Sequence, residues 1–215
     1  MRRDAFVEGA IYHVCNKSIS HFNIFHESYF ADRFLEVVEY YNSSANTISY
    51  SQLEKYGRAF MPTNILSRND KNIIRPLAYC IMPDHYHLLF KSLVQDNKKI
   101  YLYISTIENS FSRYFNLNKK RKGPLWQSRF RSVLIKSDEQ LLHVSRYIHL
   151  NPVTAELVDK PEKWTHSSYQ QYLDQNKLNE LHEISINTPL TYKKFVENNK
   201  DYQKTLKRIK SRLLE

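Results

Sequence analysis

His85 and His87 are separated by one residue in a stretch that favours a β-strand. Alternate residues of a strand point to the same face, so the two imidazoles could hold one metal ion between them. A pair of solvent-facing histidines on an edge strand would have the same spacing. The pattern alone leaves both interpretations open.

Tyr147 and Asn151 are four residues apart in a stretch that is typical of a helix. Residues at this spacing share a helix face, and an amide oxygen suits a hard ion such as Mg²⁺ or Mn²⁺. The alternative is a core aromatic at Tyr147 and a helix-terminal residue at Asn151, before Pro152. Because Tyr114 has Asn118 at the same spacing, spacing alone does not set Tyr147 apart from the other tyrosines.

The region from residue 109 to residue 137 contains eight basic residues and no acidic one, with aromatic residues between them. Basic side chains follow phosphates and aromatic rings stack on unpaired bases, whereas a solvated helix face would normally mix charges. We therefore expect contact with nucleic acid, and the candidate DNA-binding residues are Arg113, Lys119, Lys120, Arg121, Lys122, Trp126, Arg129 and Arg131. A second basic stretch, residues 193–212, could be a further DNA contact or a soluble terminal helix.

The composition narrows the classes of protein to consider. A formal net charge of +10 indicates a polyanionic partner, either nucleic acid or an anionic membrane surface. The sequence contains no apolar run of about 18 residues, the length of a spanning helix, and its start has no secretory signal pattern. Its three glycines are scattered, which argues against a glycine-rich phosphate loop. Cys15 and Cys80 lie in apolar runs and are expected to be buried thiols in a reducing cytoplasm.

The periodicity of apolar residues predicts an α+β fold. It indicates a strand at 9–16, a helix at about 29–41, a hairpin of strands at 76–82 and 85–93, a helix at 97–117, a strand at 130–135, and a helix that starts after Ser137 and stops before Pro152. This order fits a ferredoxin-like antiparallel sheet with helices on one face. Residues 42–72 are expected to be a loop-rich insertion with a short helix near 51–58, and residues 154–215 a helical tail.

Five short motifs occur in a fixed order along the chain. They are GAIYHV at 9–14, MPDHYHLL at 82–89, LWQSRF at 125–130, RYIHLNPV at 146–153 and WTHSSY at 164–169. Together they resemble the single-tyrosine HUH transposases, and in particular the REP-associated tyrosine transposases, which are relatives of the small insertion-sequence transposases. The resemblance covers about residues 6–173 and leaves the insertion at 42–72 outside. Position 86 carries Tyr where the family usually has an aliphatic residue.

The resemblance implies a site and a reaction. His85 and His87 would bind a divalent ion, Mg²⁺ or Mn²⁺, with Asn151 as the third ligand and Tyr147 as the catalytic nucleophile. A 5′-phosphotyrosine and a free 3′-OH would form, so that a nicked strand could be rejoined without ATP. The domain would be of the HUH endonuclease type, spanning residues 1–175, and a basic helical tail would span 176–215.

Three further residues are secondary candidates at this site. His13 could face it from the neighbouring strand, and Arg146 could lower the pKa of Tyr147. His149 ranks below Asn151 as a ligand because it lies on a different face of the helix from Tyr147.

The expected partner is single-stranded DNA beside an imperfect palindrome that forms a hairpin, and no membrane. We expect a cytoplasmic, nucleoid-associated protein, and both a homodimer and a monomer are compatible with the sequence. Two other functions share some of these features. A non-catalytic protein that binds structured DNA or RNA would have the same basic surface, and a metal-dependent hydrolase that uses water would not need Tyr147.

Overall fold

The computed structural model describes residues 5–57, 60, 66, 72–186 and 188–198. No helix within these ranges is long and apolar enough to cross a membrane. The strands and the larger helices occur in the predicted order, which is β1 (Ile11–Lys17), α1 (Ser28–Asn42), α2 (Tyr50–Lys55), β2 (Ile74–Met82), β3 (His85–Ser92), α3 (Asn97–Asn118), β4 (Arg131–Ile135) and α4 (Asp138–Thr154). Three short helices follow, α5 (Tyr169–Tyr172), α6 (Gln175–Asn179) and α7 (Pro189–Glu197).

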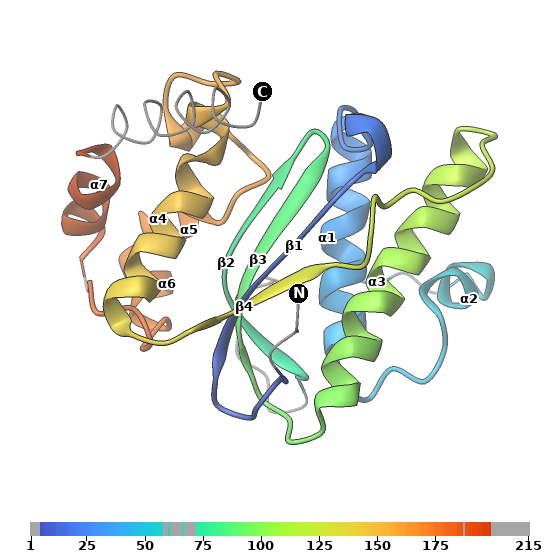
Figure 1. Ribbon diagram of the computed structural model, residues 1–215, viewed down its shortest axis with the longest axis horizontal. Helices are drawn as coiled ribbons and strands as arrows, with labels where there is room; N and C mark the ends of the chain where they lie inside the picture. Colours follow the sequence, from blue (N-terminus) through green and yellow to red (C-terminus); the bar gives the residue numbers. More distant parts are fainter. Residues whose placement is uncertain (1–4, 58–59, 61–65, 67–71, 187, 199–215) are drawn as a thin grey trace.

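The four strands form one antiparallel sheet with the order β2-β3-β1-β4. Helices α1 and α3 lie together on one side of this sheet, whereas α4 lies on the other side and packs mainly against β2 (Figure 1). The predicted α+β fold is confirmed, and α1 and α3 share one face as expected. The position of α4 shows that the second face of the sheet is also covered.

Strand alternation separates core residues from candidate site residues. Tyr12 and Val14 of β1 and Tyr86 of β3 are buried on the side of α1 and α3. There, the ring of Tyr86 lies 4.8 Å from that of Phe34 in α1 and 5.6 Å from that of Trp126. The residues between them in β1 and β3 therefore point to the side of α4.

A polar network ties the core to the loop before β4. The carboxylate of Glu108 in α3 accepts hydrogen bonds from the Tyr86 hydroxyl and from the Asn16 amide, both at 2.8 Å. The same amide donates to the carbonyl of Ser128, and the indole of Trp126 donates to the carbonyl of Glu108. This network explains how a tyrosine is accommodated at position 86, because its hydroxyl has a buried partner.

Helix α4 begins as predicted but continues further than predicted. Ser137 is its N-cap and accepts a hydrogen bond from the backbone of Gln140. The expectation that the helix stops before Pro152 is wrong, because α4 includes Pro152 and ends at Thr154. Proline removes one helical donor, but the hydrogen bond from the Ala155 amide to the Asn151 carbonyl closes the last turn. Asn151 therefore stays helical.

The segments outside the sheet are only partly helical. The region 154–198 contains short helices joined by turns, so the prediction of a helical tail holds only in part. Residues 199–215, which carry Lys204, Lys207, Arg208, Lys210 and Arg212, lie outside the described residues. In the region 42–72, α2 matches the expected short helix, and its N-cap Ser49 forms a capping box with Gln52. The division of the chain at residue 175 stays a prediction.

Candidate active site

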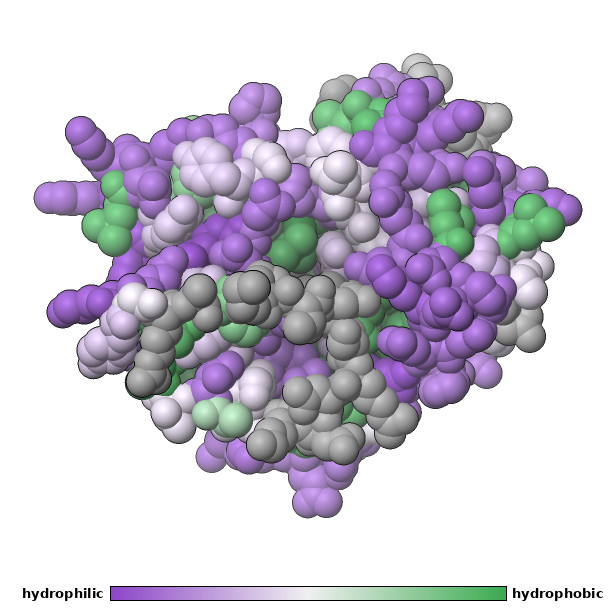
Figure 2. All heavy atoms as spheres, turned by 180° about the vertical axis from the view of Figure 1, so that it is seen from behind, coloured by the Kyte–Doolittle hydropathy of each residue, from purple (hydrophilic) through white to green (hydrophobic). Residues whose placement is uncertain are grey.

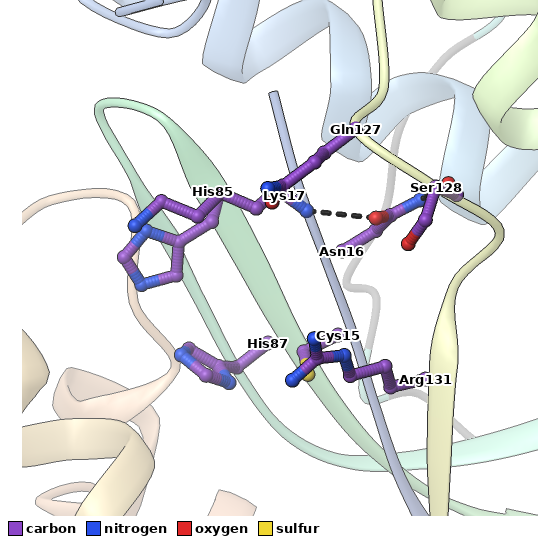
Figure 3. Close-up of a pocket in the computed structure, with 8 residues that line it drawn as sticks. All are labelled: Cys15, Asn16, Lys17, His85, His87, Gln127, Ser128 and Arg131. Atoms are coloured by element: carbon purple, nitrogen blue, oxygen red, sulfur yellow. Dashed lines mark hydrogen bonds between the residues drawn. The ribbon is translucent and has the colours of Figure 1, made fainter. Parts of the chain in front are cut away.

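The histidines of β3 lie on the face of the sheet that α4 covers. The rings of His85 and His87 are 5.0 Å apart between centroids. His13 of β1 is next to them, with its Nε2 atom 2.9 Å from Nδ1 of His87. Cys15 is paired directly with His87 across β1 and β3. Figure 3 shows His85, His87 and Cys15 around one pocket.

Asp84 holds His85 in one orientation. Its carboxylate is hydrogen-bonded to Nδ1 of His85, and it also pairs with Lys17 and His21. Burial disfavours the charge of Asp84, but the contacts with His85 and Lys17 outweigh it and lower the pKa of Asp84 below its ordinary value. An ionised Asp84 keeps the proton of His85 on Nδ1, which leaves Nε2 free as a ligand.

His87 is buried, with 5% of its surface exposed, and its Nε2 atom has no hydrogen-bond partner among the described residues. Burial lowers the pKa of His87 well below its ordinary value, and the neighbouring His13 and His85 lower it further. Burial also lowers the pKa of His13 to about 4. Both imidazoles are therefore neutral at physiological pH, which is the form that binds a metal ion.

Tyr147 extends from α4 toward the histidines. Its ring centroid lies 5.5 Å from that of His87 and 6.4 Å from that of His13, and 41% of its surface is exposed. Burial raises the pKa of Tyr147 above its ordinary value, and the side chain of Asn151 opposes this shift. The amide nitrogen of Asn151 is buried without a partner in the part of the chain that the structure describes. The i, i+4 spacing therefore places both side chains on the inner face of α4.

The pocket beside the histidines has a volume of about 170 Å³. It is lined by Cys15, Asn16, Lys17, His85, His87, Gln127, Ser128 and Arg131 (Figure 3). Lys17 and Arg131 give it two positive charges, which suits a phosphate group. Burial raises the pKa of the Cys15 thiol, and the charge of Arg131 opposes this shift.

Several residues in or beside this pocket were missed by sequence reasoning. Cys15 and Lys17 continue the alternation that starts at His13, so the period of two in β1 could have identified them. Asp84 precedes His85 directly, and only its contact with the ring shows its role. Gln127 and Ser128 belong to the motif at 125–130, but no residue pattern placed them beside the histidines.

Two of the secondary candidates do not face the histidines. His149 is fully buried, and its ring nitrogens are each 2.8 Å from a hydroxyl, Nδ1 from that of Tyr192 and Nε2 from that of Ser168. Burial lowers its pKa to about 3, so it is a neutral residue that anchors α4. Arg146 packs on the ring of Phe195 in α7 and contacts His143. That Arg146 lowers the pKa of Tyr147 stays a prediction; burial raises this pKa, and the guanidinium of Arg146 packs on Phe195 of α7.

Tyr147 and the alternative candidate Tyr114 lie on different sides of the sheet. Tyr114 lies on α3, on the other side of the sheet, where the guanidinium of Arg33 lies 4.5 Å from its ring centroid. Its ring also contacts that of Phe30 in α1. Tyr114 is thus a packing residue between two helices and does not share a face with the histidines.

The candidate DNA-binding residues are spread over both sides of the sheet. Of the eight, Arg131 lines the histidine pocket, whereas Arg113 lines a second cavity near α1 and α3. Arg121 is bonded to Asn116 and to backbone carbonyls of its own loop, and Lys119 pairs with Glu27. Trp126 packs in the aromatic core, and the exposed residues Lys120, Lys122 and Arg129 lie in or near the loop between α3 and β4. Figure 2 shows a largely hydrophilic face with small separate hydrophobic patches.

Residues 46–151 match the family described as Transposase IS200 like. A protein of Haemophilus influenzae classed as a REP-associated tyrosine transposase is 33% identical over 104 residues, which cover 44% of this chain and 58% of that protein. The resemblance to the IS200-like transposases is confirmed. The match begins at residue 46, so most of the segment 42–72, expected to lie outside the resemblance, falls inside the matched range. The alignment with the Haemophilus protein spans less than two thirds of that protein.

The fold was also compared with solved structures. A REP-associated tyrosine transposase bound to a REP hairpin superposes with a TM-score of 0.52 at 16% identity, over 80% of this chain and 84% of that chain. A protein of Deinococcus radiodurans classed as a transposase has a TM-score of 0.37 at 14% identity, over 69% of this chain and 95% of that chain. The first of these shows that this chain shares the fold of that transposase.

The IS200-like resemblance implies a divalent metal ion, and the residues present fit one. Nε2 of His87 and the amide nitrogen of Asn151 are buried atoms without a hydrogen-bond partner among the described residues. Such orphaned groups are costly unless a ligand completes them. The oxygen and nitrogen of an amide can exchange places by a simple flip, which would offer Asn151 as an oxygen ligand. By the resemblance, His85, His87 and Asn151 would supply two nitrogen ligands and one oxygen ligand.

Proposed function

We propose that this chain nicks and rejoins single-stranded DNA beside a hairpin, with Tyr147 as the nucleophile. The observation that carries the proposal is the approach of the Tyr147 ring to His87, at 5.5 Å, across the space between α4 and the sheet. The match to IS200-like transposases supports it, as does the fold shared with a transposase that was solved with a REP hairpin. The histidines, Asn151 and Tyr147 all come from one chain, so a single copy could form the whole site.

His85, His87 and Asn151 would hold a divalent ion, Mg²⁺ or Mn²⁺. When bound, such an ion acts as a Lewis acid on the scissile phosphate. Asp84 fixes the ring of His85, and burial keeps His87 neutral, so both imidazoles present a lone pair. Lys17 and Arg131 are placed to neutralise the phosphate in the pocket.

Tyr147 would attack the scissile phosphorus in line. Its hydroxyl oxygen forms a new bond to phosphorus, the bond from phosphorus to the 3′-oxygen breaks, and the 3′-oxygen leaves as a hydroxyl after it gains a proton. Because burial raises the pKa of Tyr147, the phenol is protonated at neutral pH before substrate binds. Its proton must therefore pass to an acceptor during the attack. In the reverse step, a 3′-OH displaces Tyr147 and restores a phosphodiester.

A covalent-adduct assay with matched tyrosine variants tests this proposal. A hairpin-bearing oligonucleotide, labelled on the side that keeps the 5′-phosphate, is incubated with the protein and Mn²⁺ and separated under denaturing conditions. We expect a labelled protein band that disappears in Tyr147→Phe and with a chelator, and that persists in Tyr114→Phe. A band that survives in Tyr147→Phe would refute the assignment of the nucleophile.

The same assay separates the alternatives. Hairpin binding without an adduct or cleavage, over a range of metals and substrates, would favour a non-catalytic DNA-binding protein. Cleavage that is undiminished in Tyr147→Phe would favour a hydrolase that uses water.

A further inference from the structure

A second set of metal-binding atoms lies beside the His85–His87 pair. His13, Cys15 and His87 each offer one ligand atom, and these atoms all lie within 4.8 Å of one another. The arrangement follows from the sheet, because His13 and Cys15 alternate on β1 and Cys15 is paired with His87 on β3. His85 is not part of this set.

The chemistry of this set differs from that of the first. It contains one sulfur and two imidazole nitrogens, which suit a soft or borderline ion such as Zn²⁺ or Co²⁺, whereas Mg²⁺ and Mn²⁺ prefer oxygen ligands. Zinc bonds of about 2.0–2.3 Å in tetrahedral geometry require ligand atoms roughly 3.3–3.6 Å apart. The observed spacing of 4.8 Å or less is therefore close enough for small side-chain rotations to close the site.

Two of the three side chains can be reached from the pocket, and one of their ring nitrogens has no hydrogen-bond partner among the described residues. Cys15 is a free, half-buried thiol, and both it and His87 line the pocket beside the sheet (Figure 3). The Nε2 atom of His87 is buried and has no partner within the described ranges. A metal ion could enter from the pocket, with the fourth position left to water.

We propose that His13, Cys15 and His87 form a thiolate–imidazole site for a soft divalent ion such as Zn²⁺, and that this ion inhibits nicking. Binding would replace the thiol proton of Cys15 with the metal and release that proton to solvent. Because both sets use His87, an ion held by Cys15 removes His87 from the set that contains His85 and Asn151. The inhibitory part rests on the proposed nicking function, whereas the metal site itself does not.

Cobalt spectroscopy tests the site without any activity assay. Co²⁺ is added to the metal-free protein, and the absorption from thiolate-to-cobalt charge transfer is recorded. We expect this absorption in the wild type, in Cys80→Ala, which keeps Cys15 as the sole cysteine, and in His85→Ala. It should be lost in Cys15→Ala. Absence of the absorption from the wild type, its persistence in Cys15→Ala, or its equal loss in His85→Ala would overturn the site. Circular dichroism confirms that each variant is folded.

Zinc inhibition is measured on the Mn²⁺-dependent covalent adduct. We expect Zn²⁺ to suppress the adduct in the wild type and in Cys80→Ala, and Cys15→Ala to require at least about tenfold more zinc, a factor that corresponds to about 1.4 kcal/mol. Equal sensitivity of Cys15→Ala and wild type would overturn the inhibitory role. If no adduct forms with any metal, the nicking proposal fails, while the cobalt spectra still decide whether the site exists.

Discussion

Because the hydroxyl of Tyr86 is hydrogen-bonded to the buried carboxylate of Glu108, removing this hydroxyl should lower the free energy of unfolding more than removing an ordinary tyrosine hydroxyl. Tyr86 is 2% exposed, and its hydroxyl donates to a carboxylate oxygen at 2.8 Å. Tyr86→Phe keeps the ring and removes only this charge-assisted bond, which is worth about 1.5–3 kcal/mol. Tyr103 is a matched control, since it is 3% exposed and donates to the neutral carbonyl of Val38 at 2.9 Å. Tyr103→Phe should lower the free energy of unfolding by about 0.5–1.5 kcal/mol.

Urea unfolding of the two variants measures this difference directly. For a chain of this size, about 1 kcal/mol corresponds to a shift of roughly 2–4 °C in the melting temperature, so Tyr86→Phe should melt about 3–12 °C below wild type. The double variant with Glu108→Gln provides the coupling energy between the two side chains. If Tyr86→Phe cost no more than Tyr103→Phe, the reasoning that Glu108 is a buried carboxylate dependent on Tyr86 would be refuted.

Three further outcomes follow from the site and its supports. Asp84→Asn should weaken Mn²⁺ binding about 10–100-fold in calorimetry, because His85 loses the carboxylate that orients it; unchanged affinity would contradict that role. Arg131→Gln should weaken hairpin binding and lower the slope of log affinity against log salt by about 1. Arg113→Gln, outside the pocket, is the control. If it lost as much affinity as Arg131→Gln, the pocket would not be the phosphate contact. The pKa of His149 is about 3 in the folded chain against 6.5 in the unfolded chain. Its stabilising effect is therefore complete above about pH 6.5 and decreases as the pH falls, by about 1.4 kcal/mol between pH 7.5 and 5.5. Urea unfolding of wild type and of His149→Gln at both pH values measures how much the free energy of unfolding falls between pH 7.5 and 5.5. This fall should be smaller by about 1.4 kcal/mol in His149→Gln. An identical fall in both proteins would argue against a neutral His149.

The features that sequence predicted well are those set by local periodicity. Alternation placed His85 and His87 on one face of a strand, and the i, i+4 rule placed Tyr147 with Asn151. The order of strands and helices followed from the same patterns. These depend only on neighbouring residues and therefore need no knowledge of the fold.

The features that sequence could not predict depend on which elements meet. Tyr114 and Tyr147 have the same spacing to an asparagine, and they differ because α3 and α4 pack on opposite faces of the sheet. The contact between His13 and His87 joins residues that are 74 positions apart, so it needs the register of β1 and β3. His149 carries no local sign that Tyr192 and Ser168 occupy both of its nitrogens.

The alternation along β3 makes assembly of the site depend on the core. Tyr86 enters the core from between His85 and His87, so the hydrophobic packing of one side fixes the position of the two imidazoles on the other. A slip of one residue in the pairing of β3 would turn both histidines into the core and expose Tyr86. An insertion or deletion of a single residue in this strand is thus expected to disturb the core and the histidine pair together.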